Sequence, residues 1–211
     1  PETRANRLVR ATLVALGYHE CITDAFVPEE WAKTFAPEAE SYQIQNPINA
    51  ERPVIRAALV PSPLEARSTN RLAQDVRLFE IGRTYRRTAN GPVESDRLSI
   101  LDDRGVEYIR GAIEALVRAL ALAGECELFP EQSMPGMVEG SGASLRLNGT
   151  NFAQIGLVGK AEADRFDLVM QPAAGEVAID FIATSKQVER AYKPLPRFPG
   201  VRRDISLSLP E

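Results

Sequence analysis

Three arginines near the end of one segment have the clearest potential for chemistry in this chain. The segment, residues 76–87, reads VRLFEIGRTYRR. Its β-branched and aromatic residues predict a strand that buries one face and carries charge on the other. The guanidinium groups of Arg83, Arg86 and Arg87 could bind a phosphate, because clustered arginines stabilise the charge of a transferring phosphoryl group. The alternative is a solvated or partner-facing strand end that binds no ligand.

One acidic residue lies inside the same predicted strand. Glu80 stands between Phe79 and Ile81, and a buried carboxylate is costly to desolvate unless a cation pairs with it. Arg77 and Arg56 are the candidate partners. We therefore expect Glu80 to fix the geometry of the strand and of a neighbouring helix.

Other residues that could bind metals or act as nucleophiles are sparse. His19 is the only histidine, which excludes a two-histidine metal site. Asp102 and Asp103 belong to a D-D-R-G sequence that favours a turn over a metal site. Cys21 and Cys126 stand far apart and in no paired motif, so we expect reduced, structural thiols. No catalytic residue and no metal ligand is assigned.

The composition is that of an ordinary globular protein. Of 211 residues, 44% are hydrophobic and 26% are charged, and the formal net charge is −4. Such a chain lacks the basic excess that a nonspecific nucleic-acid binder needs. The best candidate for a membrane span, residues 111–124, is interrupted by Glu114 and Arg118, and no signal-peptide pattern stands at the start. We expect a cytoplasmic protein with no membrane partner, and a piece of a longer chain because the sequence begins at Pro1 without methionine.

Patterning in the first hundred residues predicts helices and strands that would position these side chains. Thr3 can cap a helix that runs to about Leu16 and ends at Gly17. Asn90-Gly91 favours a tight turn that would set two strands antiparallel. The expected helices are 3–16, 28–35 and 61–72, and the expected strands are 19–27, 42–45, 76–87 and 97–101.

The second half is expected to contain one long helix and one clear hairpin. Apolar residues at helical spacing make a single stripe over residues 107–122. Asn148-Gly149 accepts the positive φ angles of a tight turn and predicts a hairpin with a return strand at 152–158. The remaining expected elements are helices at 161–166 and 183–190 and strands at 177–181 and 202–209.

The arginine segment also resembles a known motif. The pattern F-E-I-G-x-x-[FY]-R is similar to motif 2 of class II aminoacyl-tRNA synthetases, in which the strand's arginine holds the α-phosphate of ATP. Those enzymes continue as F-R-x-E, but here Thr88 stands where the acidic residue would be. Their second phosphate-binding pattern, G-x-G-x-x-R, does not occur in the chain. The resemblance therefore implies a vestigial motif 2 in a synthetase-like fold, made of Glu80, Arg83, Arg86 and Arg87.

Two further segments resemble one family, the phenylalanyl-tRNA synthetase β subunit of the bacterial type. Residues 46–65, NPINAERPVIRAALVPSPLE, follow that family's N-P-[IL]-x-x-E-x-x-x-[LIM]-R-x-x-L-[LV]-P-x-x-L-E pattern. Residues 192–207 resemble the junction that leads into its C-terminal ferredoxin-like domain. Residues 134–137, MPGM, lie where the family often has a histidine-containing segment, so no polar role is carried over to them.

The resemblance implies an α+β fold and a division of the chain. The fold would be a mainly antiparallel sheet flanked by helices, as in class II synthetases, with a smaller α/β portion. Residues 1–192 would form a catalytic-like but noncatalytic module, with a possible subdivision near residue 104. Residues 193–211 would be a linker and the truncated first strand of a C-terminal ferredoxin-like, anticodon-binding-type domain.

The same resemblance implies a scaffolding function. In this family the α subunit carries catalysis, so the chain would pair with α in an α2β2 enzyme that attaches phenylalanine to tRNA. The parent enzyme needs ATP and Mg²⁺ and contacts tRNA as a whole, whereas this chain is expected to bind neither ATP nor Mg²⁺ tightly. The helix at 3–16 and the strand after it have the layout of motif 1, which makes dimer interfaces in class II synthetases. The candidate interface residues are Leu8, Leu13, Leu16 and Leu64.

Two other functions remain open from the sequence. In the first, Arg86 and Arg87 still bind a nucleotide and the chain is an ATP-binding enzyme. In the second, the chain is an RNA-binding module that uses basic residues beside Phe198. Those basic residues are Arg197, Arg202 and Arg203.

Overall fold

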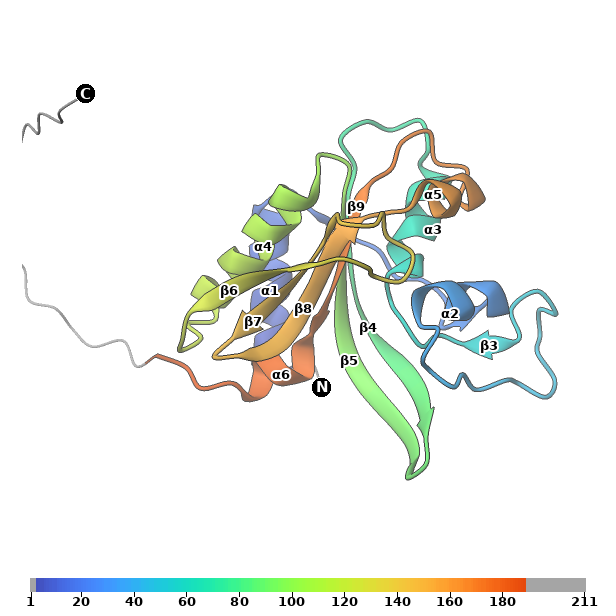
Figure 1. The fold of residues 1–211 in the computed structure, drawn as a ribbon, viewed down its shortest axis with the longest axis horizontal. Helices are drawn as coiled ribbons and strands as arrows, with labels where there is room; N and C mark the ends of the chain where they lie inside the picture. The colour runs from blue at the N-terminus through green and yellow to red at the C-terminus, as the bar shows by residue number, and fades with distance from the viewer. Residues whose placement is uncertain (1–2, 189–211) are drawn as a thin grey trace, which may run out of the picture.

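The protein, seen as a computed structural model that describes residues 3–188, has a mixed α+β architecture built on one large sheet (Figure 1). The sheet has seven strands in the order β1-β4-β5-β9-β8-β7-β6. Neighbouring strands are antiparallel except β1 and β4, which are parallel. The predicted antiparallel sheet is therefore confirmed. Its strands are β1 (His19–Glu20), β4 (Arg77–Thr88), β5 (Gly91–Asp102), β6 (Cys126–Glu131), β7 (Gly142–Leu147), β8 (Thr150–Leu157) and β9 (Ala173–Ala178).

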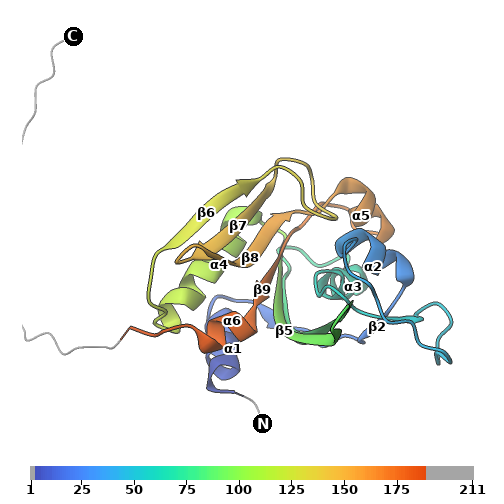
Figure 2. The same ribbon diagram turned by 60° about the horizontal axis from the view of Figure 1, so that its bottom comes forward.

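Helices cover both faces of this sheet. Helices α1 (Arg4–Ala15) and α4 (Val106–Ala119) lie side by side on one face. Helices α2, α3 and α5 gather in a second group, on the other side of the molecule (Figures 1 and 2). That group is α2 (Glu29–Phe35), α3 (Pro61–Thr69) and α5 (Lys160–Arg165), and it is joined by a small sheet of β2 (Phe26–Val27) and β3 (Val54–Ile55). Helix α6 (Ile179–Thr184) follows β9 directly.

Alternation along β4 divides its side chains between two apolar cores. Phe79 pairs with Ile100 of β5, and both side chains pack in the larger core with Ile113 of α4. Leu78 points to the opposite face and packs with Leu64 of α3 in a second core. Because successive residues of a strand face opposite sides, each side chain of β4 is assigned to one of these two surfaces.

Several local predictions are confirmed. Thr3 caps α1, since its Oγ1 accepts a hydrogen bond of 3.2 Å from the backbone N–H of Asn6. The hairpin between β7 and β8 turns at Asn148 and Gly149, whose φ angles are +52° and +79°. The β4–β5 hairpin is also present, although its pairing extends to Thr88 and Gly91, so the return strand begins at 91 rather than at 97.

The predicted strand at 19–27 is wrong in its middle. The chain forms two short strands there, β1 in the large sheet and β2 in the small one. Between them, Thr23 donates to the Glu80 carboxylate and Asp24 accepts from the backbone N–H of Phe26. These side-chain bonds replace ladder hydrogen bonds and turn the chain out of the large sheet.

Other element boundaries differ from the predictions for similar local reasons. The expected strand at 42–45 is a single bridge, Gln43 to Val54, and the expected helix at 61–72 ends at Thr69. The predicted strand at 177–181 lies instead at Ala173–Ala178, and the helix expected from 183 begins at Ile179. Strands β3 and β6 were not predicted.

The large sheet runs across the proposed subdivision near residue 104. Strand β5 precedes that position and pairs with β9, which follows it, and one core contains side chains from both halves. The expected α/β portion is therefore part of the same antiparallel sheet. The predicted strand at 202–209, the junction at 192–207 and the linker at 193–211 lie outside the described residues, so the boundary at 192 stays a prediction. No helix within residues 3–188 has the length and apolar character needed to cross a bilayer.

Candidate functional site

A buried ion pair lies at the centre of the motif 2-like region. Arg56 donates from Nη1 to Oε1 of Glu80 at 2.7 Å, and the other carboxylate oxygen accepts from the Thr23 hydroxyl at 2.7 Å. Arg56 also donates from Nε to the backbone carbonyl of Arg83 at 3.0 Å. Both side chains of the pair are less than a tenth exposed. This pair confirms one of the two partners expected for Glu80, and it ties the segment before α3 to the middle of β4.

A glycine makes room for this pair. Gly82 lies on the same face of β4 as Glu80, and a Cβ atom at Gly82 would collide with the Arg56 guanidinium. The glycine of the F-E-I-G pattern therefore permits a close approach of a side chain to the strand. Glu80 and Gly82 thus have a structural role, because together they hold the Arg56 side chain against β4.

The predicted arginines do not converge, because they alternate along the strand. Arg83 and Arg87 lie on one face of β4, and Arg86 lies on the other with Glu80. Arg83 is exposed and pairs with Glu94 and Asp96 of β5 at 2.8 and 2.9 Å. Its hydrogen bond to Asp96 is the main reason that its pKa lies above the ordinary value.

Of these three arginines, only Arg86 faces a cleft together with polar groups of neighbouring strands. Its Nε donates to the backbone carbonyl of Ala57 at 3.2 Å. Two adjoining hollows of about 370 and 250 Å³ share Arg86, Gln154 and Glu176 in their walls. The larger hollow also has an apolar wall from α2, the segment before α3 and the loop at residues 134–137, and Arg87 also lines it.

Acidic residues occupy this cleft and the strand–helix junction next to it. Glu176 of β9 accepts a hydrogen bond of 2.6 Å from the backbone N–H of Leu59, and its other oxygen lies 3.8 Å from Nε of Arg97. Strand β9 runs directly into α6, which is the layout in which class II enzymes place G-x-G-x-x-R. The first turn of α6 carries Asp180, which accepts from the backbone N–H of Asp96 at 2.9 Å. A triphosphate bound beside Arg86 would therefore meet the Glu176 carboxylate.

The two aspartates of the D-D-R-G sequence are engaged in structural bonds. Asp102 is fully buried and accepts from the Tyr18 hydroxyl at 2.6 Å and from the Arg104 guanidinium at 2.7 and 2.9 Å. Burial by itself would raise the pKa of Asp102, but the bonds from Arg104 and Tyr18 outweigh it and hold the pKa below its ordinary value. Burial and the neighbouring carboxylate raise the pKa of Tyr18. Asp103 accepts from Arg67 at 3.1 Å.

Both cysteines are free thiols in partly buried positions. Burial raises the pKa of Cys21 to about 12, and it also raises the pKa of Cys126. A thiol with a raised pKa carries little thiolate at neutral pH, so neither residue is a good nucleophile. The expectation of structural thiols agrees with these environments.

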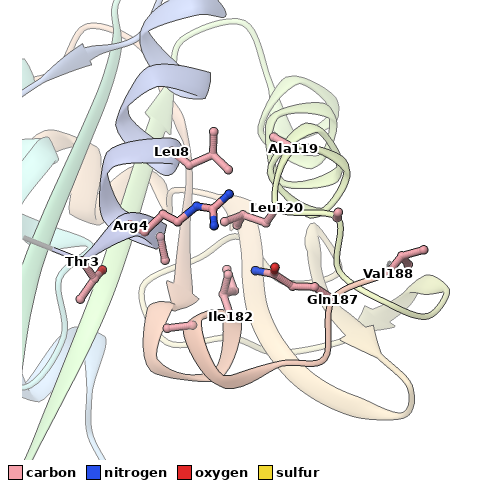
Figure 3. A pocket seen from close by; sticks show the side chains of 11 residues that line it. Thr3, Arg4, Leu8, Ala119, Leu120, Ile182, Gln187 and Val188 are labelled. Atoms are coloured by element: carbon pink, nitrogen blue, oxygen red, sulfur yellow. The ribbon is translucent and has the colours of Figure 1, made fainter. Parts of the chain in front are cut away.

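A third hollow, of about 680 Å³, lies away from the cleft. It is bounded by the start of α1, the end of α4 and α6 (Figure 3). Leu8, Leu120 and Ile182 give it apolar walls, and among its described lining residues only Arg4 is charged. None of the lining residues within 3–188 is a carboxylate, so these residues offer no acid–base pair.

The four leucines predicted to contact a partner fall in different environments. Leu13 and Leu64 are fully buried in the chain's own cores, which corrects their assignment as surface contacts. Leu8 is partly buried against the larger core, and Leu16 is 40% exposed. Helix α1 buries Leu13 on its inner side, and the apolar periodicity that identified Leu13 reports that inner side.

Exposed apolar residues that the sequence analysis missed lie near the β1 edge of the sheet. Val14 near the end of α1 is 59% exposed, Ile22 just after β1 is 91% exposed, and Leu72 just after α3 is 92% exposed. Ile22 shares a shallow surface hollow with Asn70 at the end of α3. Val14 is apolar but lies outside the buried apolar stripe of α1. Such a residue is the sequence signal that could have identified this surface.

Comparison with known proteins decides the family. Residues 1–179 match the family model described as the phenylalanyl tRNA synthetase beta chain CLM domain. The chain belongs to this family. It is 32% identical over 229 residues to the phenylalanine–tRNA ligase beta subunit of Novosphingobium aromaticivorans, which covers 98% of this chain and 29% of that protein. It is 28% identical to the beta subunit of Neisseria meningitidis over the whole of this chain and 28% of that protein.

Structural comparison confirms the fold class. A pyrrolysyl tRNA synthetase of Desulfitobacterium hafniense superposes with a TM-score of 0.68 and 16% sequence identity, over 85% of this chain and 64% of that one. At such low identity the likeness concerns the fold alone. The chain spans less than a third of the length of the curated relatives that it matches in the family.

The buried ion pair generates a prediction about stability. Replacing Glu80 by Gln keeps the shape but leaves the Arg56 guanidinium buried without an opposite charge, so we expect a loss of about 3–5 kcal/mol in the free energy of unfolding. Urea denaturation measures this loss. The double variant Arg56→Met, Glu80→Gln should recover part of it, because no uncompensated charge remains.

The control for this prediction is Arg83→Gln, which removes an arginine of the same strand from an exposed pair and should hardly change the denaturation midpoint. A Glu80→Gln variant as stable as the parent would show that the pair does not hold this region together.

The lowered pKa of Asp102 generates a prediction about pH. A carboxyl group whose folded-state pKa is depressed stabilises the fold above its unfolded pKa, and this contribution is lost as pH falls through the folded pKa. We expect Asp102→Asn to lower the free energy of unfolding by about 1–3 kcal/mol at pH 7. The difference from the parent should shrink below about pH 4. Urea denaturation between pH 7 and pH 3.5 measures it, and a difference that stays constant with pH would contradict the role given to the charged form.

Proposed function

We propose that this chain is a noncatalytic scaffold of a phenylalanine–tRNA ligase and pairs with the catalytic α subunit of that enzyme. The observation that carries the proposal is the state of the nucleotide-type cleft. Only Arg86 of the three motif 2-like arginines faces it, Glu176 stands inside it, and Asp180 occupies the first turn of α6. Phosphoryl transfer to or from a nucleotide needs several cations that converge on the phosphates, and this cleft does not supply them.

The fold nevertheless keeps the geometry of a class II synthetase, which supports a role as the structural counterpart of a catalytic subunit. The buried pair of Arg56 and Glu80 keeps β4 in place without any nucleotide. In the proposed assembly, ATP and Mg²⁺ act at the α subunit, and tRNA is contacted by the whole α2β2 enzyme. A cytoplasmic location would follow from that function.

The surface proposed for the α subunit includes the end of α1, the edge strand β1 and the end of α3. Strand β1 lies at the end of the sheet order, so within residues 3–188 one of its sides has no neighbouring strand in the large sheet. Val14, Leu16, Ile22 and Leu72 expose apolar side chains around it. Exposed apolar groups beside an open strand edge fit a protein partner, because burial of both would stabilise a complex.

The two alternative functions have less support. The hypothesis that Arg86 and Arg87 together bind a nucleotide has little support, because their side chains lie on opposite faces of β4. The RNA-binding alternative depends on Arg197, Arg202, Arg203 and Phe198, which lie outside the described residues.

Assembly gives the first test of the proposal. We expect the double variant Val14→Glu, Ile22→Glu to weaken co-purification with the α subunit by at least about tenfold in affinity, because two carboxylates would be desolvated at the contact. Size-exclusion chromatography of the co-expressed subunits measures the complex. Val169→Glu is the matched control, since Val169 is also exposed but lies beyond α5.

Circular dichroism must show that the variants remain folded. Unchanged assembly of the double variant would exclude the proposed surface.

Nucleotide binding gives the second test. We expect calorimetric titration of the chain with ATP and Mg²⁺ to show no binding in the micromolar range, because Glu176 and Asp180 repel a triphosphate. Micromolar binding that disappears in Arg86→Ala but persists in Arg83→Ala would favour the ATP-binding alternative over the scaffold.

A further inference from the structure

We propose that the cleft beside Arg86 binds a small monocarboxylate with an apolar body. The site consists of the two adjoining hollows of about 370 and 250 Å³ on the face of the sheet opposite α1 and α4. This inference concerns ligand binding and does not depend on the assembly proposed above. It requires a wall for the apolar body, a free cation for the carboxylate and a charge balance that favours one negative charge.

The apolar wall comes from elements that meet across the cleft. Phe35 of α2, Val60 next to α3, and Met134 and Met137 of the connecting loop line the larger hollow. A Cβ atom at Gly136 would collide with the ring of Phe35, so the glycine lets this loop close against α2. A pocket with apolar walls and a few polar groups is the usual form of a small-molecule site.

Arg86 provides the free cation. Its Nε is held by the carbonyl of Ala57, which fixes the direction of the side chain. No other hydrogen bond or ion pair of this guanidinium is formed within residues 3–188, so its two terminal nitrogens remain available. A guanidinium held in this way can donate two parallel hydrogen bonds to a carboxylate.

Arg97 adds positive charge to the smaller hollow. Its only ion-pair contact among the described residues is Glu176, at 3.8 Å, which is too long for a hydrogen bond. Its Nε is buried and has no hydrogen-bond partner in the described part of the chain. Glu176 is itself bound to the backbone N–H of Leu59, so it does not fully satisfy Arg97.

The charges that line the smaller hollow favour a monoanion. Arg86 and Arg97 stand there with Glu176, which leaves a formal excess of one positive charge. Glu38 and Arg87 line only the larger hollow, and Arg87 lies 4.0 Å from Glu40. One carboxylate would neutralise this excess, whereas a triphosphate would bring several uncompensated negative charges close to Glu176. The site is therefore suited to a carboxylate and poorly suited to a nucleotide.

The test uses 3-phenylpropionate as the probe and 3-phenylpropionamide as its neutral analogue. Ligand-observed NMR titration of the full chain should show submillimolar binding of the acid and binding at least about tenfold weaker for the amide, because only the acid can pair with the free guanidinium. Arg86→Gln should abolish the preference for the acid.

Arg83→Gln is the matched control, because Arg83 is an arginine of the same strand that faces the opposite side and is already paired. It should bind the acid as the parent does. Equal binding of acid and amide, no binding of the acid up to several millimolar, or equal loss in the two arginine variants would each overturn the proposal. None of these results would alter the assembly test, because Val14 and Ile22 do not line this cleft.

The same titration distinguishes a free small acid from the carboxyl end of a polypeptide. N-acetyl-Gly-Phe presents the same carboxylate and ring on a peptide chain. Binding of this peptide at least as tight as that of 3-phenylpropionate would indicate a protein terminus as the source of the carboxylate. Weaker binding of the peptide would indicate a free small molecule.

Discussion

The hydrogen-bonded ion pair between Arg56 and Glu80 is the constraint on which this region of the structure depends. Two charges removed from water are tolerated only when they meet in good geometry and their remaining donors and acceptors are satisfied. Thr23 and the Arg83 carbonyl complete that requirement here. As a result, three parts of the chain that are distant in sequence have fixed positions: the turn after β1, the segment before α3 and the middle of β4. The position of the cleft wall follows from them.

The pair also explains how a synthetase-like strand can keep its sequence pattern without a nucleotide. In an active site, charged residues can be held by the ligand that they bind. Here Glu80 is satisfied by Arg56, Arg83 by the acids of β5, and Glu176 by a backbone N–H. Each of these three charges has a partner inside the chain, so their positions do not depend on a phosphate to balance them. Arg86 is the exception on the cleft face.

The sequence predicted those parts of the fold that depend on local chemistry. The Thr3 cap, the Asn148-Gly149 turn and the apolar stripe of α4 are each decided within a few residues. Strand β6 was missed because its sequence, CELFPE, contains a proline and does not alternate regularly between apolar and polar residues. Its structure is decided by its pairing with β7 at the sheet edge. The boundary between β9 and α6 was misplaced because Ile179 suits a strand or a helix equally, and its burial in the core is a tertiary effect.

The candidate site was harder to predict from the sequence, because it depends on which face of a strand each side chain occupies and on the register in which the strands pair. The four motif-like residues are close in sequence, yet a period of two separates Arg83 and Arg87 from Glu80 and Arg86. Glu176 and Arg97 join Arg86 only through the pairing of β5 with β9, which no local pattern specifies. Likewise, the periodicity that identified Leu13 reports burial in this chain's own core, and contact with a partner is reported by apolar residues that depart from the stripe. The surfaces available to a ligand and to a partner are therefore set by the residues left over once the core and the ion pairs have been satisfied.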